Sequence, residues 1–219
     1  MFRLLFEKTD NAIWISHLDL MRLFQRAFKR AGLQLSHTQG FNPRPSVSIA
    51  LPLSVGVESC CELLDFDLEG EKVSCDDIKC RLNQCLTDGV KVICVYEGGR
   101  KIRDLKYLEC EISMEYDAGI PDSAIERISS LLNKEALIVT KKTKSGNQEQ
   151  DIIPMISSYK VSIENQNVLM LNAKICCQNP TLNPAQLIAA ITKYLPEYQP
   201  DFTKCTRIEL YDQQGNQFR

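Results

Sequence analysis

The first hundred residues alternate between strand-like and helix-like hydrophobic patterns. Four segments rich in apolar residues have the length and turn-flanked character of strands: 2–8, 46–57, 61–69 and 90–97. Two amphipathic segments, 17–31 and 76–86, each follow a serine with an aspartate three residues later, Ser16 with Asp19 and Ser74 with Asp77, which is the spacing of a capping box. The order β-α-β-β-α-β predicts a ferredoxin-like unit.

The pattern begins again after the polar segment 97–104, which contains a pair of glycines and is typical of a linker. The second half predicts helices at 121–135 and 183–195, a loop at 143–150, a hairpin in 159–175, and strands at 106–117, 136–142 and 204–212. The fold class predicted is therefore α+β, with two tandem ferredoxin-like units of which the second has an extra strand. The predicted domains are 1–98 and 105–219.

The first predicted helix has a basic face opposite its apolar stripe. At 100° per residue, Phe24, Ala27, Phe28 and Ala31 lie near Leu20, and the far side collects the four cations Arg22, Arg26, Lys29 and Arg30. No acid lies four residues from the arginines, and Asp19 is assigned to the helix cap and dipole. Two interpretations remain open: a solvated face, or a surface that binds phosphate or carboxylate groups.

The segment HTQGFNPRP (37–45) predicts a stiff loop, because Gly40 permits a positive φ while Pro43 and Pro45 hold the chain extended. Such a loop can act as a recognition edge, in which an aromatic ring stacks on a base, amides contact its edge and a guanidinium binds phosphate. The candidate RNA-binding residues here are Gln39, Phe41, Asn42 and Arg44. The alternative is a structural crossover in which Phe41 is buried.

Charge distribution and cysteine spacing limit the kinds of ligand and cofactor that we expect the chain to bind. The formal net charge is −2, but residues 1–50 carry seven Lys/Arg against three Asp/Glu, so a site for an anion is expected there. The ten cysteines include no C-x-x-C pair, which predicts free thiols, no metal site and no cofactor. The chain has no apolar run long enough to span a bilayer and no signal-peptide pattern, so we expect a cytoplasmic protein without a membrane partner.

His17 and His37 are the only histidines, and they are the candidate catalytic residues for acid–base chemistry on a ribose hydroxyl. None of the phosphate-binding, dinucleotide-binding or serine-nucleophile motifs occurs. The sequence therefore favours a protein that is not an enzyme, without settling the question.

Two long segments, ISHLDLMRLFQRAFKRAGL and QGFNPRPSVSIALPLSVGVES, closely resemble the radical-SAM-linked protein family, a domain of unknown function. Two later segments, EQDIIPMI and CTRIELYDQQG, are similar to the second half of the same family. The resemblance implies a stand-alone chain encoded beside a radical SAM enzyme, in gene neighbourhoods that point to RNA maturation or modification. Arg44 stands where relatives often have histidine. The chain has no C-x-x-x-C-x-x-C triplet, so it does not itself hold the radical SAM cluster.

Three functions follow as hypotheses. The first is a noncatalytic accessory of a radical SAM enzyme that binds RNA or presents substrate. The second is a metal-independent endoribonuclease that uses His17 or His37, by analogy of fold. The third is a protein-interaction module, in which the acidic segment 61–71 docks on a basic partner.

Overall fold

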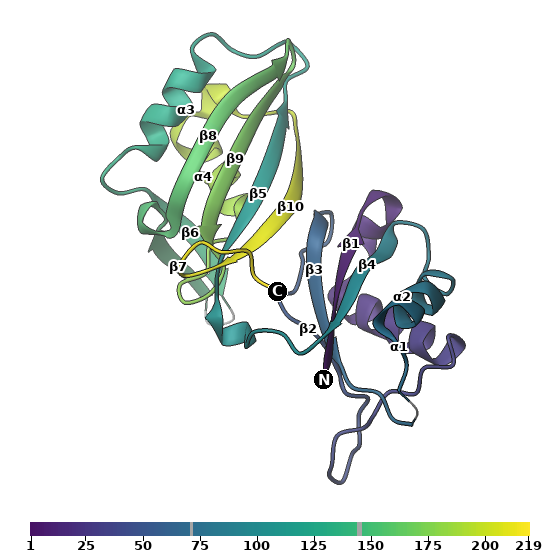
Figure 1. Cartoon of the computed structure of the whole chain (residues 1–219). Coiled ribbons are helices and arrows are strands. Elements are labelled where there is room, and N and C mark those ends of the chain that lie inside the picture. The colour runs from purple at the N-terminus through teal and green to yellow at the C-terminus, as the bar shows by residue number, and fades with distance from the viewer. Residues whose placement is uncertain (71, 144–145) are drawn as a thin grey trace. The chain divides into compact units, whose positions relative to one another are not determined.

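The computed structural model describes residues 1–70, 72–143 and 146–219 (Figure 1). The chain divides into two compact units, Met1–Ile102 together with Arg219, and Arg103–Phe218. Each unit is described by itself below.

The first unit is an antiparallel sheet with two helices on one face (Figure 1). Its strands follow the order β4-β1-β3, and β2 pairs with β3 beyond that. The elements are β1 (Phe2–Lys8), a 3-10 helix η1 (Asp10–Trp14), α1 (His17–Arg30), β2 (Val47–Ile49), β3 (Glu58–Phe66), α2 (Cys75–Asn83) and β4 (Val90–Glu97).

The predicted helix 17–31 is confirmed as α1, and its sequence explains both ends. Ser16 caps the first turn by accepting a hydrogen bond from the backbone N of Asp19 at 3.2 Å. Gly32, just past the last turn, has a φ of +66°, the left-handed conformation that favours glycine after a helix. Between these ends, Phe24 packs edge-on against Phe6 of β1 and Phe28 lies against Phe66 of β3, each with ring centroids 4.8 Å apart. The apolar stripe therefore fixes which face of α1 is left for solvent.

The predicted strand 46–57 is wrong in its length, because only the three residues of β2 pair with β3. Pro52 has no backbone N–H for a ladder hydrogen bond, and Gly56 has a φ of +83°, outside the extended region. The chain instead leaves the sheet after β2 and returns at β3.

The second unit arranges the strands of its sheet in the same order as the first unit, counted along the chain. Its antiparallel sheet has the order β10-β5-β9-β8. The elements of this sheet and its helices are η2 (Ile102–Asp104), β5 (Leu105–Glu115), α3 (Ala124–Leu132), η3 (Ile153–Met155), β8 (Ile156–Asn165), β9 (Val168–Cys176), α4 (Pro184–Tyr194), η4 (Pro196–Tyr198) and β10 (Phe202–Asp212). These elements confirm the predicted α+β class.

A separate hairpin lies between α3 and η3, formed by β6 (Ile138–Thr143) and β7 (Gly146–Asp151). The predicted strand 136–142 is confirmed as β6, whereas the predicted loop at 143–150 is wrong because the segment from 146 is a second strand. The composition of β7 is typical of a loop, because Asn147, Gln148 and Glu149 are polar and exposed, and the strand pairs with β6 through its backbone. Residues 144 and 145 of the predicted loop lie outside the described residues.

Within the described ranges, no helix is both long enough and apolar enough to cross a bilayer.

Candidate functional site

Three of the four predicted cations of α1 line one open groove. Arg22, Arg26 and Arg30 are spaced four residues apart, so they share one row along the helix. The groove has a volume of about 500 Å³, and its other lining residues are Ile15, Asp19 and Leu23. All three arginines are exposed to solvent.

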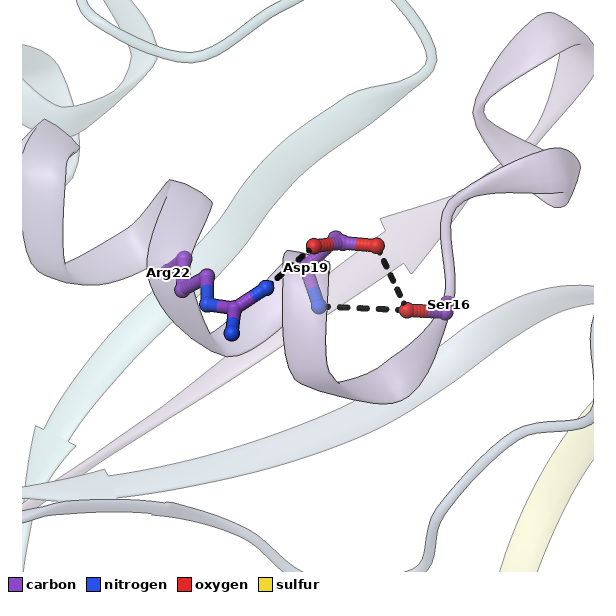
Figure 2. A network of polar contacts seen from close by, with 3 residues as sticks. All are labelled: Ser16, Asp19 and Arg22. Atoms are coloured by element: carbon purple, nitrogen blue, oxygen red, sulfur yellow. Dashed lines mark hydrogen bonds and ion pairs between the residues drawn. The ribbon is translucent and has the colours of Figure 1, made fainter.

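Asp19 neutralises part of this row (Figure 2). Its carboxylate accepts a hydrogen bond from the Ser16 hydroxyl at 2.7 Å and one from Arg22 Nη1 at 2.8 Å. These two hydrogen bonds lower the pKa of Asp19 below its ordinary value. The expectation that Asp19 serves only the cap and dipole is therefore wrong, because a carboxylate three residues before an arginine reaches it on the same helical face.

Arg30 is also engaged, since its Nη2 donates a hydrogen bond to the backbone carbonyl of Cys85, just beyond α2. Arg26 and Lys29 are exposed, and neither has a hydrogen bond or ion pair to another described residue. Of the four predicted cations, these two are the ones left available to an anionic ligand.

Lys29 does not line this groove. It lines a second hollow, at the base of the loop 37–45. The loop contributes His37 and Pro45, and α1 contributes Gln25 and Lys29. The hollow has a volume of about 490 Å³, and its remaining lining residues are Phe28, Gly32, Leu33, Gln34 and Leu35. The predicted cations thus face two sites, because 22, 26 and 30 form one row of the helix while 25 and 29 form the next.

The loop itself is held closed at its base. His37 and Pro45 form an antiparallel bridge, and the backbone N of Thr38 donates to the carbonyl of Arg44 at 2.9 Å. The Thr38 hydroxyl accepts a hydrogen bond from the backbone N of Arg44 at 3.1 Å. In Figure 1 this segment extends away from the first unit between α1 and β2.

The loop tip presents its side chains to solvent. Phe41 is fully exposed, with a relative accessibility of 111%, and Gln39, Asn42 and Arg44 are also exposed. The alternative in which Phe41 is buried as a plug is therefore wrong. A large aromatic ring without protein contacts is unusual for a folded chain and favours a role in binding.

The two histidines lie at opposite ends of α1. His17 is half-buried at the first helical residue, whereas His37 is exposed in the hollow beside Lys29. At 1.5 Å per residue, the twelve residues from His17 to Lys29 span about 18 Å. His37 lines the same hollow as Lys29, so the structure does not bring the two histidines together at one end of α1.

The acidic segment 61–71 offers little free charge over its described part, 61–70. Glu62 is buried, and Asp65 forms a paired contact with Arg3, with Nε–Oδ1 and Nη2–Oδ2 distances of 2.6 Å and 2.9 Å. Asp67 pairs with the amino terminus at 2.8 Å. Residue 71 lies outside the described residues. The acids predicted to dock a partner are thus mostly used within the unit.

The part of the chain that the structure describes contains no assembled metal site. All ten cysteines are free, and the described residues contain no group of three or more His, Cys, Asp or Glu side chains that could hold a metal ion.

Gln25 is the site residue that the sequence reasoning missed. It lies half-buried in the hollow, four residues before Lys29 and on the same row of α1. Its spacing from Lys29 is visible in the sequence, but the hollow that it lines depends on the tertiary position of the loop 37–45.

The comparison with protein families identifies the chain. A family model described as "Uncharacterized protein conserved in bacteria (DUF2344)" matches residues 1–184. The chain belongs to this family. That membership agrees with the predicted resemblance to a family of unknown function. The DUF2344 description does not mention radical SAM enzymes, so the link to such an enzyme stays a prediction.

No curated protein matches the DUF2344 chain. Among solved structures, a chain of "Crystal Structure of a Cbf5-Nop10-Gar1 Complex" is similar with a TM-score of 0.53 and 8% identity, covering 95% of this chain and 48% of that one. The DUF2344 chain therefore spans about half the length of that structure, and at this identity the likeness concerns the fold alone. "Crystal Structure of an Unknown Protein from Galdieria sulphuraria" aligns with a TM-score of 0.27 and 11% identity, over 94% of this chain and 96% of that one.

Proposed function

We propose that this DUF2344 protein is a noncatalytic accessory of a radical SAM enzyme, and that it binds RNA through the loop 37–45 and the neighbouring face of α1. The proposal includes two tandem ferredoxin-like units. It is supported by the matching strand orders of the two sheets, with the hairpin β6–β7 as an insertion in the second.

The observation that carries the RNA proposal is the fully exposed ring of Phe41 on a loop with a closed base. Single-stranded nucleic acid offers the flat apolar surface that such a ring lacks in the free protein. Arg44, three residues on in the same loop, is exposed and offers a guanidinium for a phosphate, and Asn42 offers an amide for a base edge. The hydrogen bonds of Thr38 reduce the ordering that the loop must undergo on binding.

The electrostatic contribution in this proposal is modest. Arg26, Lys29 and Arg44 are exposed, while Arg22 is paired with Asp19. Three phosphate contacts would give a salt dependence with a log–log slope of about −2 for single strands, far less than an extended basic surface. Stacking on Phe41 therefore supplies much of the affinity in this proposal.

The radical SAM half rests on the sequence resemblance. The chain contains no cysteine triplet of cluster-binding spacing, so the radical chemistry is assigned to the partner and the recognition of RNA to this chain.

The test is binding of fluorescein-labelled single-stranded RNA, followed by anisotropy at low salt. Phe41→Ala should weaken binding by about fivefold to about 100-fold, since loss of a stacked base costs about 1–3 kcal/mol. Phe202→Ala is the matched control, because Phe202 is also exposed (59%) but lies in the second unit. RNA binding that is absent in the wild type, or equal losses in the two variants, would refute the RNA proposal.

The partner half is tested by copurifying the tagged chain from its native cells and looking for a radical SAM protein, as the resemblance implies, before and after nuclease treatment. A complex that survives nuclease supports a direct accessory role. A complex that forms only through RNA, or none at all, contradicts it.

A further inference from the structure

The hollow at the base of the loop has an apolar floor and a polar rim. The apolar lining residues, which form the floor, are the half-buried Pro45 and the almost wholly buried Phe28, Leu33 and Leu35. Gln25 and Lys29 rise from α1 at the rim. A volume of about 490 Å³ lies within the range of small-ligand pockets, roughly 300–1,000 Å³, and a mostly apolar lining with a few polar groups is their usual composition.

The charged groups of the hollow favour an anion. Lys29 is exposed at the rim and has no ion pair with another described residue, and His37 stands beside it. Among the described residues, no aspartate or glutamate lines the hollow. Gln34, another lining residue, donates a hydrogen bond from its Nε2 to Glu69 Oε2 at 3.4 Å. A ligand that fits therefore has a flat apolar part for the floor and a negative group for the rim.

We propose that this hollow binds one nucleotide, with its base on the apolar floor beside Pro45 and its phosphate at Lys29. Gln25, whose amide both donates and accepts, is placed to contact the edge of the base. The inference rests on the proposed function and deepens it, because it divides the RNA site into two positions. A second base stacks on Phe41, which is four residues from His37 and so at most about 14 Å away along the chain.

The experiment titrates the ¹⁵N-labelled full chain with the four ribonucleoside 5′-monophosphates, with ribose 5-phosphate and with adenosine at low millimolar concentration. A nucleotide in the hollow should shift the side-chain amide of Gln25 and the backbone amides of Gly32 and Leu33. Ribose 5-phosphate should bind at least about fivefold more weakly because it leaves the apolar floor uncovered, and adenosine should do so because it lacks the phosphate.

Two charge reversals on neighbouring rows of α1 locate the site. Lys29→Glu should weaken mononucleotide binding at least about fivefold, whereas Arg26→Glu, an equal change of charge in the other groove, should change it less than twofold. Both side chains are exposed, so both variants should fold, and thermal melting checks this.

The outcomes separate this inference from the function on which it rests. If the chain binds RNA but no mononucleotide shifts the hollow, or if ribose 5-phosphate binds as tightly as the nucleotides, the nucleotide position is wrong and the RNA proposal stands. If mononucleotides shift the hollow of a chain that binds no RNA, the proposed function is wrong and the nucleotide site stands. Equal effects of Lys29→Glu and Arg26→Glu would overturn the assignment to the hollow.

Discussion

The Thr38 hydroxyl is the side-chain group that ties the two sides of the loop together, and its removal should loosen the loop without disturbing the core. Thr38→Val keeps the side-chain shape but removes the acceptor for the Arg44 backbone N, 3.1 Å away. Thr38→Ser keeps the hydroxyl and is the matched control. Because the residue is exposed, the hydrogen bond is worth about 0.5–1 kcal/mol, near the low end of the range for neutral bonds.

This magnitude predicts a two- to fivefold rise in the amide exchange rate of Arg44 in Thr38→Val, with no such rise in Thr38→Ser. Hydrogen exchange followed by mass spectrometry or NMR measures it at one pH, and the global melting temperature should stay within error. RNA affinity should fall by no more than the same factor, because only loop preorganisation changes. An Arg44 amide that exchanges equally fast in all three proteins would refute the assignment of this hydrogen bond.

Three further predictions concern stability. Asp65→Ala should lower the free energy of unfolding by about 3 kcal/mol in urea titrations, because it leaves the guanidinium of Arg3, only 1% exposed, without its carboxylate; a loss below about 1 kcal/mol would argue against a buried pair. Gly99→Ala should have a free energy of unfolding at least about 1 kcal/mol lower than Gly98→Ala. Both glycines have positive φ, but a Cβ at 99 would lie 2.8 Å from Arg3 Cζ, while one at 98 meets no atom within 4 Å. Equal losses of stability in the two variants would contradict this. Burial raises the pKa of Cys177 from 9.0 to about 12, so above about pH 9 the unfolded chain loses a thiol proton that the folded chain keeps, and stability should fall as the pH rises. Cys177→Ala should reduce the fall in urea midpoint between about pH 8 and about pH 10, and an unchanged fall would exclude this thiol as a contributor.

The sequence predicted those parts of the fold that local chemistry determines. The capping serines Ser16 and Ser74 both accept the hydrogen bond that their spacing predicts, and the 3.6-residue apolar period gave the buried face of α1. The strand β6 was predicted, but β7 was missed because its polar residues carry neither helical nor alternating apolar periodicity. The shortness of β2 follows from proline and glycine positions that were visible but were given too little weight.

The candidate site was less predictable because its parts meet through the tertiary structure. The contact between Arg22 and Asp19 is local and was within reach of the sequence. The contact between Arg30 and the carbonyl of Cys85 joins residues 55 positions apart, and no local pattern signals it. The stiffness of the loop was evident from its prolines, but its direction, and hence the exposure of Phe41, depends on how the chain returns to the sheet.

Because the loop 37–45 lies between α1 and the short strand β2, its sequence can change independently of the rest of the first unit. Its stem closes at His37 and Pro45, and β2 is a strand of the first unit that pairs with β3 alone. Residues between the stem positions can therefore be exchanged or lengthened without shifting the register of the other strands. Bacterial relatives could in this way acquire different ligand preferences through one short stretch of the gene, and the same stretch could be grafted onto another α+β scaffold.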